Sequence, residues 1–192
     1  MKNVNEILYQ NKIQLESFTK RLNQLNDNQI THPSKEFQIK ELIGRIKCLE
    51  TIPKSNLGFS EGVYDCYDAF ILNDDGEIKT IIEIKDRTIE SWEYDETILE
   101  YKKYTRMIEY GKKNGIKYIY YMVHFSDDLT AMWRLDKLKD PKVITKKNPK
   151  ETVSSEREMI NKQIILLPID DAKIIYRGFS REEYKGVLPF KI

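Results

Sequence analysis

One stretch of the chain, residues 63–87, carries side chains whose types and spacing suit metal-assisted chemistry. It holds two runs rich in β-branched and aromatic residues, separated by Asn73-Asp74-Asp75-Gly76. Because Asp-Gly between such runs favours a tight turn, the stretch is predicted to form a β-hairpin. Asp68 lies in the first run, and Glu83 and Lys85 lie in the second. The hairpin is therefore expected to bring acidic and basic side chains close together.

The side-chain period of a strand decides which of these groups meet. Glu83 and Lys85 fall on one face of the second run. Asp68 lies opposite Glu83 if the loop is residues 75–76, and diagonal to it if the loop is residues 73–76, whereas a three-residue loop or a bulge would break the arrangement. Opposite Cβ atoms are about 5 Å apart, so two carboxylates can share a cation. Hard oxygen ligands without Cys or His nearby favour Mg²⁺ over Zn²⁺.

Asp68 followed by the triplet Glu83-Ile84-Lys85 resembles the motif of the PD-(D/E)XK nuclease superfamily. In that family the two acids bind Mg²⁺, and the lysine orients or helps to activate the water that hydrolyses a phosphodiester. The resemblance therefore implies that Asp68 and Glu83 are metal ligands and that Lys85 orients the water. It extends more loosely over residues 34–135. One departure is Tyr67, which stands where the motif has Pro.

Two other interpretations compete with a nuclease. An acid-x-Lys triplet also occurs on strands by chance, where a charged pair forms a solvated edge and the protein is merely structural. The stronger rival is a nuclease-like fold without catalysis, which acts as a binding or adaptor module through its N-terminal helix. The presence of all three residues, Asp68, Glu83 and Lys85, argues against that rival.

Length and composition set broader limits. The chain has 192 residues, 40% of them hydrophobic and 33% charged, which is typical of a globular protein with an apolar core. Its net charge of +1 means that any DNA binding must depend on local patches. Phosphate-binding glycine loops are absent, and two cysteines and two histidines argue against a disulfide framework or a zinc hydrolase. Without a signal-like start or a long apolar run, a cytoplasmic, intracellular protein that does not enter membranes is expected.

Residues 3–26 are predicted to form an amphipathic helix, because apolar residues recur at alternating spacings of four and three. We assign residues 1–28 to an N-terminal helical appendage and residues 29–192 to the nuclease-like domain. The apolar stripe requires a partner. It packs either on the body of the same chain or, as a coiled coil, on a second copy in a homodimer.

A second helix is predicted from Ser34 to about Glu50, with Glu36 near its apolar stripe. In the resembling family, an acid from this helix often joins the metal site, which makes Glu36 the candidate third metal ligand. The alternative is a carboxylate in an exposed first turn, where the helix dipole favours it.

A third helix is predicted from about Asp95 to Asn114, with Gly115 past its end. This helix is basic, which suits either a surface that faces phosphates or a solvated helix. The residues predicted to contact DNA are Lys102, Lys103 and Arg106 of this helix and Arg87 of the preceding loop.

The remaining chain is predicted to complete a sheet. Residues 117–125 are predicted to form a buried central strand, and residues 130–135 a further strand. His124, at the end of the central strand, is either a proton shuttle or a structural histidine. Residues 137–157 are polar and lysine-rich and are expected to form a loop, either closing on DNA or disordered. Residues 163–169 and 173–176 are expected to form short strands that extend the sheet or cover an edge.

These expectations combine into one hypothesis. The fold class is α/β, with the restriction-endonuclease-like αβββαβ core that the resemblance implies, a mixed central sheet and a weak first strand within residues 57–64. The function is a DNA endonuclease that depends on Mg²⁺, with Mn²⁺ as a substitute. In such an enzyme the metal polarises the scissile phosphate and activates water, while a lysine offsets charge in the transition state.

Overall fold

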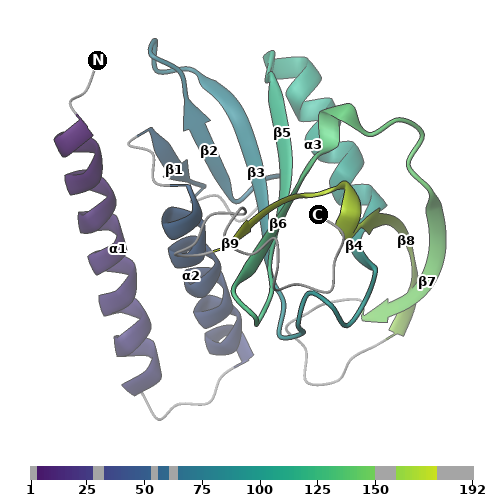
Figure 1. Ribbon diagram of the computed structural model, residues 1–192, viewed down its shortest axis with the longest axis horizontal. Coiled ribbons are helices and arrows are strands. Elements are labelled where there is room, and N and C mark those ends of the chain that lie inside the picture. The colour runs from purple at the N-terminus through teal and green to yellow at the C-terminus, as the bar shows by residue number, and fades with distance from the viewer. Residues whose placement is uncertain (1–3, 28–32, 53–55, 61–64, 150–158, 177–192) are drawn as a thin grey trace, which may run out of the picture.

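The computed structural model describes residues 4–27, 33–52, 56–60, 65–149 and 159–176 (Figure 1). Over these residues the protein is a mixed α/β structure with helices packed on a central sheet, which confirms the predicted fold class at that level. The described helices are α1 (Val4–Asp27), α2 (Pro33–Thr51) and α3 (Tyr101–Asn114), with short 3₁₀ turns at Leu135–Lys137 and Ile169–Asp171.

The central sheet has six strands in the order β1-β2-β3-β5-β6-β9. Neighbouring strands are antiparallel except β3 and β5, which run parallel, so the sheet is mixed as predicted. The strands are β1 (Leu57–Phe59), β2 (Ala69–Leu72), β3 (Ile78–Asp86), β5 (Tyr118–His124), β6 (Leu129–Arg134) and β9 (Lys173–Tyr176).

The alternating side chains of β3 separate two cores. Ile82 faces α2 and packs with Cys48 in the smaller core, on the side where α1 lies outside α2 (Figure 1). Ile81 faces the opposite side and packs with Met107 of α3 in the larger core. This is the predicted two-face division of β3, and Glu83 and Lys85 continue the face of Ile81.

A second, three-stranded sheet completes the larger core. It has the order β4-β8-β7, with β4 (Glu96–Glu100), β8 (Met159–Pro168) and β7 (Val143–Pro149). Ile165 and Leu167 of β8 are buried against the central sheet. Of the two predicted C-terminal strands, the second extends the central sheet as β9, while the first belongs to this separate sheet.

The predicted start of the third helix at Asp95 is wrong. Residues 96–100 form β4, and the helix begins at Tyr101. The run Thr97-Ile98-Leu99 suits a strand, and it pairs with residues 165–167 of β8, a partner that is distant in sequence. The predicted end is correct, because Gly115 follows the last helical residue and adopts a left-handed conformation.

The prediction of a loop over residues 137–157 is wrong for its middle part. Residues 143–149 form β7, which pairs antiparallel with β8. The strand forms because Ile144 lies opposite Ile164, so that cross-strand packing outweighs the polar composition. Residues 150–158 lie outside the described part of the chain.

Helix α1 packs on the body of its own chain. Leu15 and Phe18 pack against the smaller core. The rings of Phe18 and Phe59 meet edge to face, with 5.4 Å between their centroids. This is the first of the two expected arrangements, while the homodimer and the boundary at residue 28 remain predictions. None of the described helices is long and apolar enough to cross a membrane.

We predict that Gly115→Ala destabilises the protein by about 1 kcal/mol, because Gly115 has φ 65° and ψ 27°, where a Cβ is strained. The expected loss corresponds to a fall of roughly 2–4 °C in the melting temperature for a domain of this size. Gly115→Asn should lose less, since Asn tolerates this conformation. Thermal unfolding followed by circular dichroism checks both, and equal midpoints for wild type and Gly115→Ala would contradict the prediction.

Candidate active site

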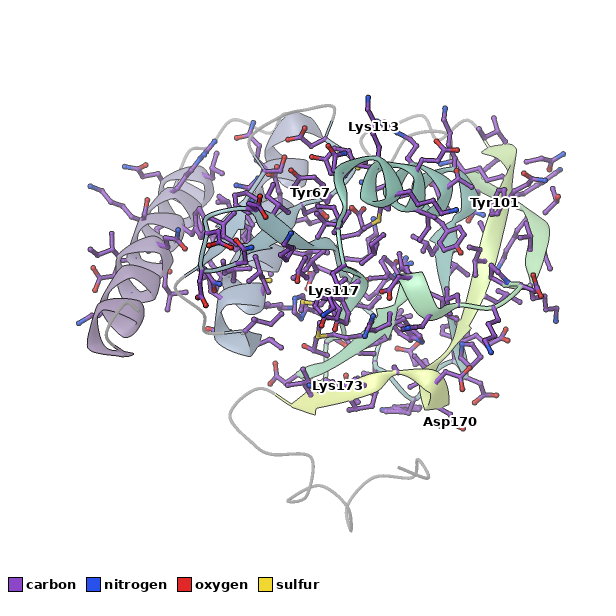
Figure 2. All side chains as sticks on the ribbon, turned by 90° about the horizontal axis from the view of Figure 1, so that it is seen from above. Tyr67, Tyr101, Lys113, Lys117, Asp170 and Lys173 are labelled. Atoms are coloured by element: carbon purple, nitrogen blue, oxygen red, sulfur yellow. The ribbon has the colours of Figure 1, made fainter. Side chains whose placement is uncertain are left out.

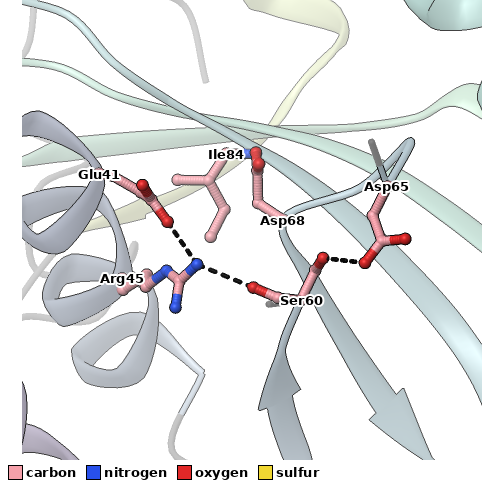
Figure 3. Close-up of polar contacts among 6 residues, drawn as sticks. All are labelled: Glu41, Arg45, Ser60, Asp65, Asp68 and Ile84. Atoms are coloured by element: carbon pink, nitrogen blue, oxygen red, sulfur yellow. Dashed lines mark hydrogen bonds and ion pairs between the residues drawn. The ribbon is translucent and has the colours of Figure 1, made fainter. Parts of the chain in front are cut away.

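The candidate site lies where β3 extends beyond its neighbour β2. The register pairs Ala69 with Ile82, and β2 begins at Ala69, so later residues of β3 have no partner on that side. Asp68 fills part of this gap, since its Oδ2 accepts a hydrogen bond of 2.7 Å from the backbone N–H of Ile84 (Figure 3). The Asp68 carboxylate is thereby fixed against β3.

The hairpin register brings Asp68 to Glu83. Extending the observed pairing by one residue places Asp68 opposite Glu83, the arrangement expected from a loop at residues 75–76. The observed turn is wider than a two-residue loop, because the backbone N–H of Gly76 donates to the carbonyl of Asn73. A register shift between Ile71 and Leu72 follows. The wider turn and the irregularity compensate, so the predicted face is retained.

The carboxyl group of Glu83 is buried beside another acid. Its side chain is only 15% exposed, and Lys103 Nζ of α3 lies 2.7 Å from Glu83 Oε2. Burial, followed by the negative charge of Asp68, raises the pKa of Glu83 to about 8 against the opposing effect of Lys103. Burial alone would lower the pKa of Lys103, but Glu83 and Asp68 outweigh it and raise that pKa.

Lys85 lies one step further along the same face of β3. Burial and the neighbouring charge of Arg87 lower its pKa, although Glu83 and Asp68 act in the opposite direction. Arg87 is anchored, since its Nη2 donates to the carbonyl of Ile98 at 3.2 Å. The strand therefore delivers an ammonium group beside the two acids and a guanidinium group beyond it.

Glu83, Lys85, Arg87 and Lys103 line a cleft of about 420 Å³ between the central sheet, α3 and the second sheet. Cationic groups outnumber carboxylates among its described lining residues, which favours an anionic ligand. The lining residues are Glu83, Lys85, Arg87, Ile98, Leu99, Glu100, Lys103, Tyr121, Asn148, Lys162 and Ile164.

The other predicted DNA contacts divide into two groups. Arg87 and Lys103 line the cleft, whereas Lys102 and Arg106 are exposed on α3. The backbone of Glu36 lies in α2, but its side chain lies outside the described ones, so its role as a metal ligand remains a prediction.

The donor set at Asp68 and Glu83 fits a hard divalent cation. Two carboxyl groups face each other, and burial together with the negative charge of Asp68 raises the pKa of Glu83, a cost that a bound cation would offset. No group of three or more His, Cys, Asp or Glu side chains gathers into a metal site among the described residues. Mg²⁺ is commonly held by one or two carboxylates together with water and substrate phosphate, so two acids suffice.

Glu41 belongs to a separate polar chain on α2. It pairs with Arg45, which donates to the carbonyl of Ser60 at 2.8 Å, while the hydroxyl of Ser60 donates to Asp65 (Figure 3). Asp65 is thus engaged with Ser60. This chain of contacts ties α2 to the segment that leads into Asp68.

His124 shows the contacts of a structural histidine. It is fully buried, and its Nδ1 lies 2.7 Å from the hydroxyl of Thr130 on the neighbouring strand. It does not line the cleft, which leaves the proton-shuttle alternative without support.

The sequence analysis assigned no role to Lys162, Glu100 or Asn148, which also line the cleft. A signal for Lys162 was present, because it interrupts an otherwise apolar period-two series, Ile160-x-Lys162-x-Ile164. The same signal identified Glu83 and Lys85 on β3.

We predict that Glu83 makes the stability of the metal-free protein depend on pH. Because its pKa is raised from 4.5 to about 8, the folded state binds this proton more tightly than the unfolded state. The resulting stabilisation is complete below pH 4.5 and is lost as the pH rises through 8. Urea unfolding in EDTA across this range should show the loss in wild type and not in Glu83→Gln.

The matched control is Glu109→Gln, which removes an exposed carboxylate of α3. It should keep the pH dependence of the wild type. The same slope in Glu83→Gln as in wild type would contradict the assignment.

Comparison with known proteins gives limited guidance. No protein-family model matches the sequence, and no curated protein matches it. Among solved structures, the chain is similar to Hjc of Archaeoglobus fulgidus, a Holliday junction resolvase, at 12% sequence identity and a TM-score of 0.39. The alignment covers 66% of this chain and 84% of that chain.

Proposed function

We propose that this protein is a metal-dependent deoxyribonuclease that hydrolyses phosphodiester bonds of DNA as an endonuclease. One observation carries the proposal. Asp68 and Glu83 meet at the edge of a cationic cleft, and Lys85 follows on the same face of β3. Paired carboxylates with an adjacent ammonium group suit metal-assisted attack of water on a phosphate.

The order of elements is consistent with the proposal. Helix α2, the three strands β1, β2 and β3, helix α3 and strand β5 follow one another in the αβββαβ order of the resembling family, with β4 inserted before α3. We assign the nuclease core to these elements. On this assignment, β4, β7 and β8 are additions that form the far wall of the cleft.

Each residue has a role in the proposed reaction. Asp68 and Glu83 would hold Mg²⁺, for which Mn²⁺ would substitute, and Glu36 is the candidate third ligand. The bound cation would supply Lewis-acid activation of the phosphate and the attacking water. Lys85 would donate hydrogen bonds to that water and offset the negative charge that develops on the phosphate.

The DNA contacts would follow the same geometry. Arg87 and Lys103 would meet the phosphate nearest the carboxylates, since both line the cleft. Lys102 and Arg106, which are exposed on α3, would contact phosphates outside it.

The test is nicking of supercoiled plasmid in Mg²⁺ or Mn²⁺. We expect wild type to cleave, and Glu83→Gln and Lys85→Met each to lose activity by roughly 100-fold or more. Glu109→Gln, an exposed carboxylate of α3, should retain full activity. Circular dichroism and melting temperature establish that each variant is folded.

The proposal fails if folded wild type leaves duplex, single-stranded and branched DNA uncut under these conditions. That result would favour the binding-module alternative and direct attention to α1. Cleavage that is unaffected by Glu83→Gln would equally reject the assigned site.

A second prediction concerns cation binding itself. Lys103 Nζ lies 2.7 Å from Glu83 Oε2, so the ammonium group competes with any metal ion for that carboxyl group. We expect Lys103→Met to bind Mn²⁺ several-fold more tightly than wild type at pH 9, because the ammonium group of Lys103 no longer occupies the Glu83 carboxyl group. Electron paramagnetic resonance of free Mn²⁺ measures this without any cleavage.

Lys102→Met is the matched control, because it removes the same charge from the adjacent, exposed position. It should leave Mn²⁺ affinity close to that of wild type. Equal or weaker affinity in Lys103→Met would show that Lys103 does not compete for the site.

A further inference from the structure

The far wall of the cleft comes from the second sheet and carries its own polar residues. Lys162 of β8 and Asn148 of β7 line the cleft across from β3. The Lys162 side chain is only 17% exposed, and its Nζ lies 2.7 Å from Glu100 Oε1. A lysine this buried on an apolar face is costly unless charged partners compensate it.

Strand pairing places a second lysine on this face. Lys146 of β7 lies directly opposite Lys162 of β8, and Asn148 lies opposite Ile160. Residues two apart share a face, so Lys146 is on the same face as Asn148, which lines the cleft. Lys146 and Lys162 therefore stand side by side on this face, with Lys162 lining the cleft and Lys146 at an exposed position beside it.

Two like charges directly opposite each other destabilise a pair of strands. Glu100 offsets part of this repulsion, but its side chain is 53% exposed and serves Lys162. An anion bound between the two lysines would remove the remaining repulsion. The register thus identifies a position for a negatively charged ligand.

We propose that Lys146, Lys162 and Asn148 bind phosphate oxygens of the DNA backbone and hold one strand across the cleft from Glu83 and Lys85. The assignment of DNA as the ligand depends on the proposed function. A backbone fits better than a single free phosphate, because the cations are spread over β3, α3, β7 and β8 around one cleft of about 420 Å³.

The experiment measures binding of fluorescently labelled DNA in EDTA by anisotropy, over a series of salt concentrations. The double variant Lys146→Gln/Lys162→Gln should bind at least tenfold more weakly than wild type. Its slope of log affinity against log salt should fall by roughly 1.4 on single strands or 1.8 on duplex, for two lost phosphate contacts. The double variant Lys146→Arg/Lys162→Arg should retain most of the affinity.

The matched control is Lys112→Gln/Lys113→Gln, which removes two exposed charges near the far end of α3. Helix α3 contacts β8, and Figure 2 shows Lys113 at the opposite end of the helix from Tyr101. At 1.5 Å per residue, Lys112 is roughly 14 Å along the helix from Lys103, which lines the cleft. This control should keep the salt dependence of the wild type.

Because Lys162 is largely buried and paired with Glu100, the folding of its variants is checked by melting temperature. The single variant Lys146→Gln lies at an exposed position and tests the proposal without that risk. Its slope of log affinity against log salt should fall by about half as much as that of the double variant. An unchanged salt slope in folded Lys146→Gln would overturn the proposal. An equal loss in the Lys112/Lys113 control would also overturn it, since the effect would then be one of net charge.

Two further arms separate this inference from the proposed function and from free phosphate. If the double variant loses DNA binding, the inference is supported even when wild type cleaves nothing. If the double variant cleaves and binds DNA as wild type does, the inference is rejected and the proposed nuclease activity stands. Saturable binding of inorganic phosphate that the double variant abolishes, without any change in DNA binding, would also reject it.

Discussion

The parallel pairing of β3 with β5 determines how the rest of the molecule is arranged. Two parallel neighbours cannot be joined by a tight turn, so the chain must cross from the end of β3 to the start of β5. Here β4 and α3 make that crossing, and they lie over the face of β3 that carries Glu83 and Lys85. The connection therefore supplies Lys103 to the acids and, through β4, recruits the strands of the second sheet.

The candidate site arises where regular pairing on β3 stops. Beyond Ile82 the strand has no neighbour on the β2 side, which leaves backbone groups and side chains that need other partners. Asp68 satisfies the N–H of Ile84, and Lys103 offsets the charge of Glu83. The polar groups at this strand end are held by side chains, an arrangement that also keeps two carboxyl groups close together.

Local patterns predicted the hairpin well, because its determinants are close in sequence. The turn signal and the alternation along β3 predicted that Asp68 and Glu83 share a face, and the structure keeps that face because a register shift compensates for a turn wider than the Asp-Gly pair. The start of α3 was missed, since residues 96–100 form a strand only when β8, more than 60 residues away, lies beside them. Lys162 was missed for the same reason, because a lysine on a strand can be assigned to a cleft only when the elements on the other side of that cleft are known.

Two hydrogen bonds fasten the second sheet to the central sheet, and a third links two ends of the second sheet to each other. Tyr121 donates to the carbonyl of Ile98 at 3.0 Å, Trp133 donates to the carbonyl of Pro168 at 2.8 Å, and the N–H of Ile169 donates to the carbonyl of Asp95 at 2.9 Å. Because Tyr121 and Trp133 are almost fully buried, these links are shielded from competing water. The spacing between the two walls is consequently preorganised, and a ligand that fits it would bind with little loss of conformational entropy from the protein.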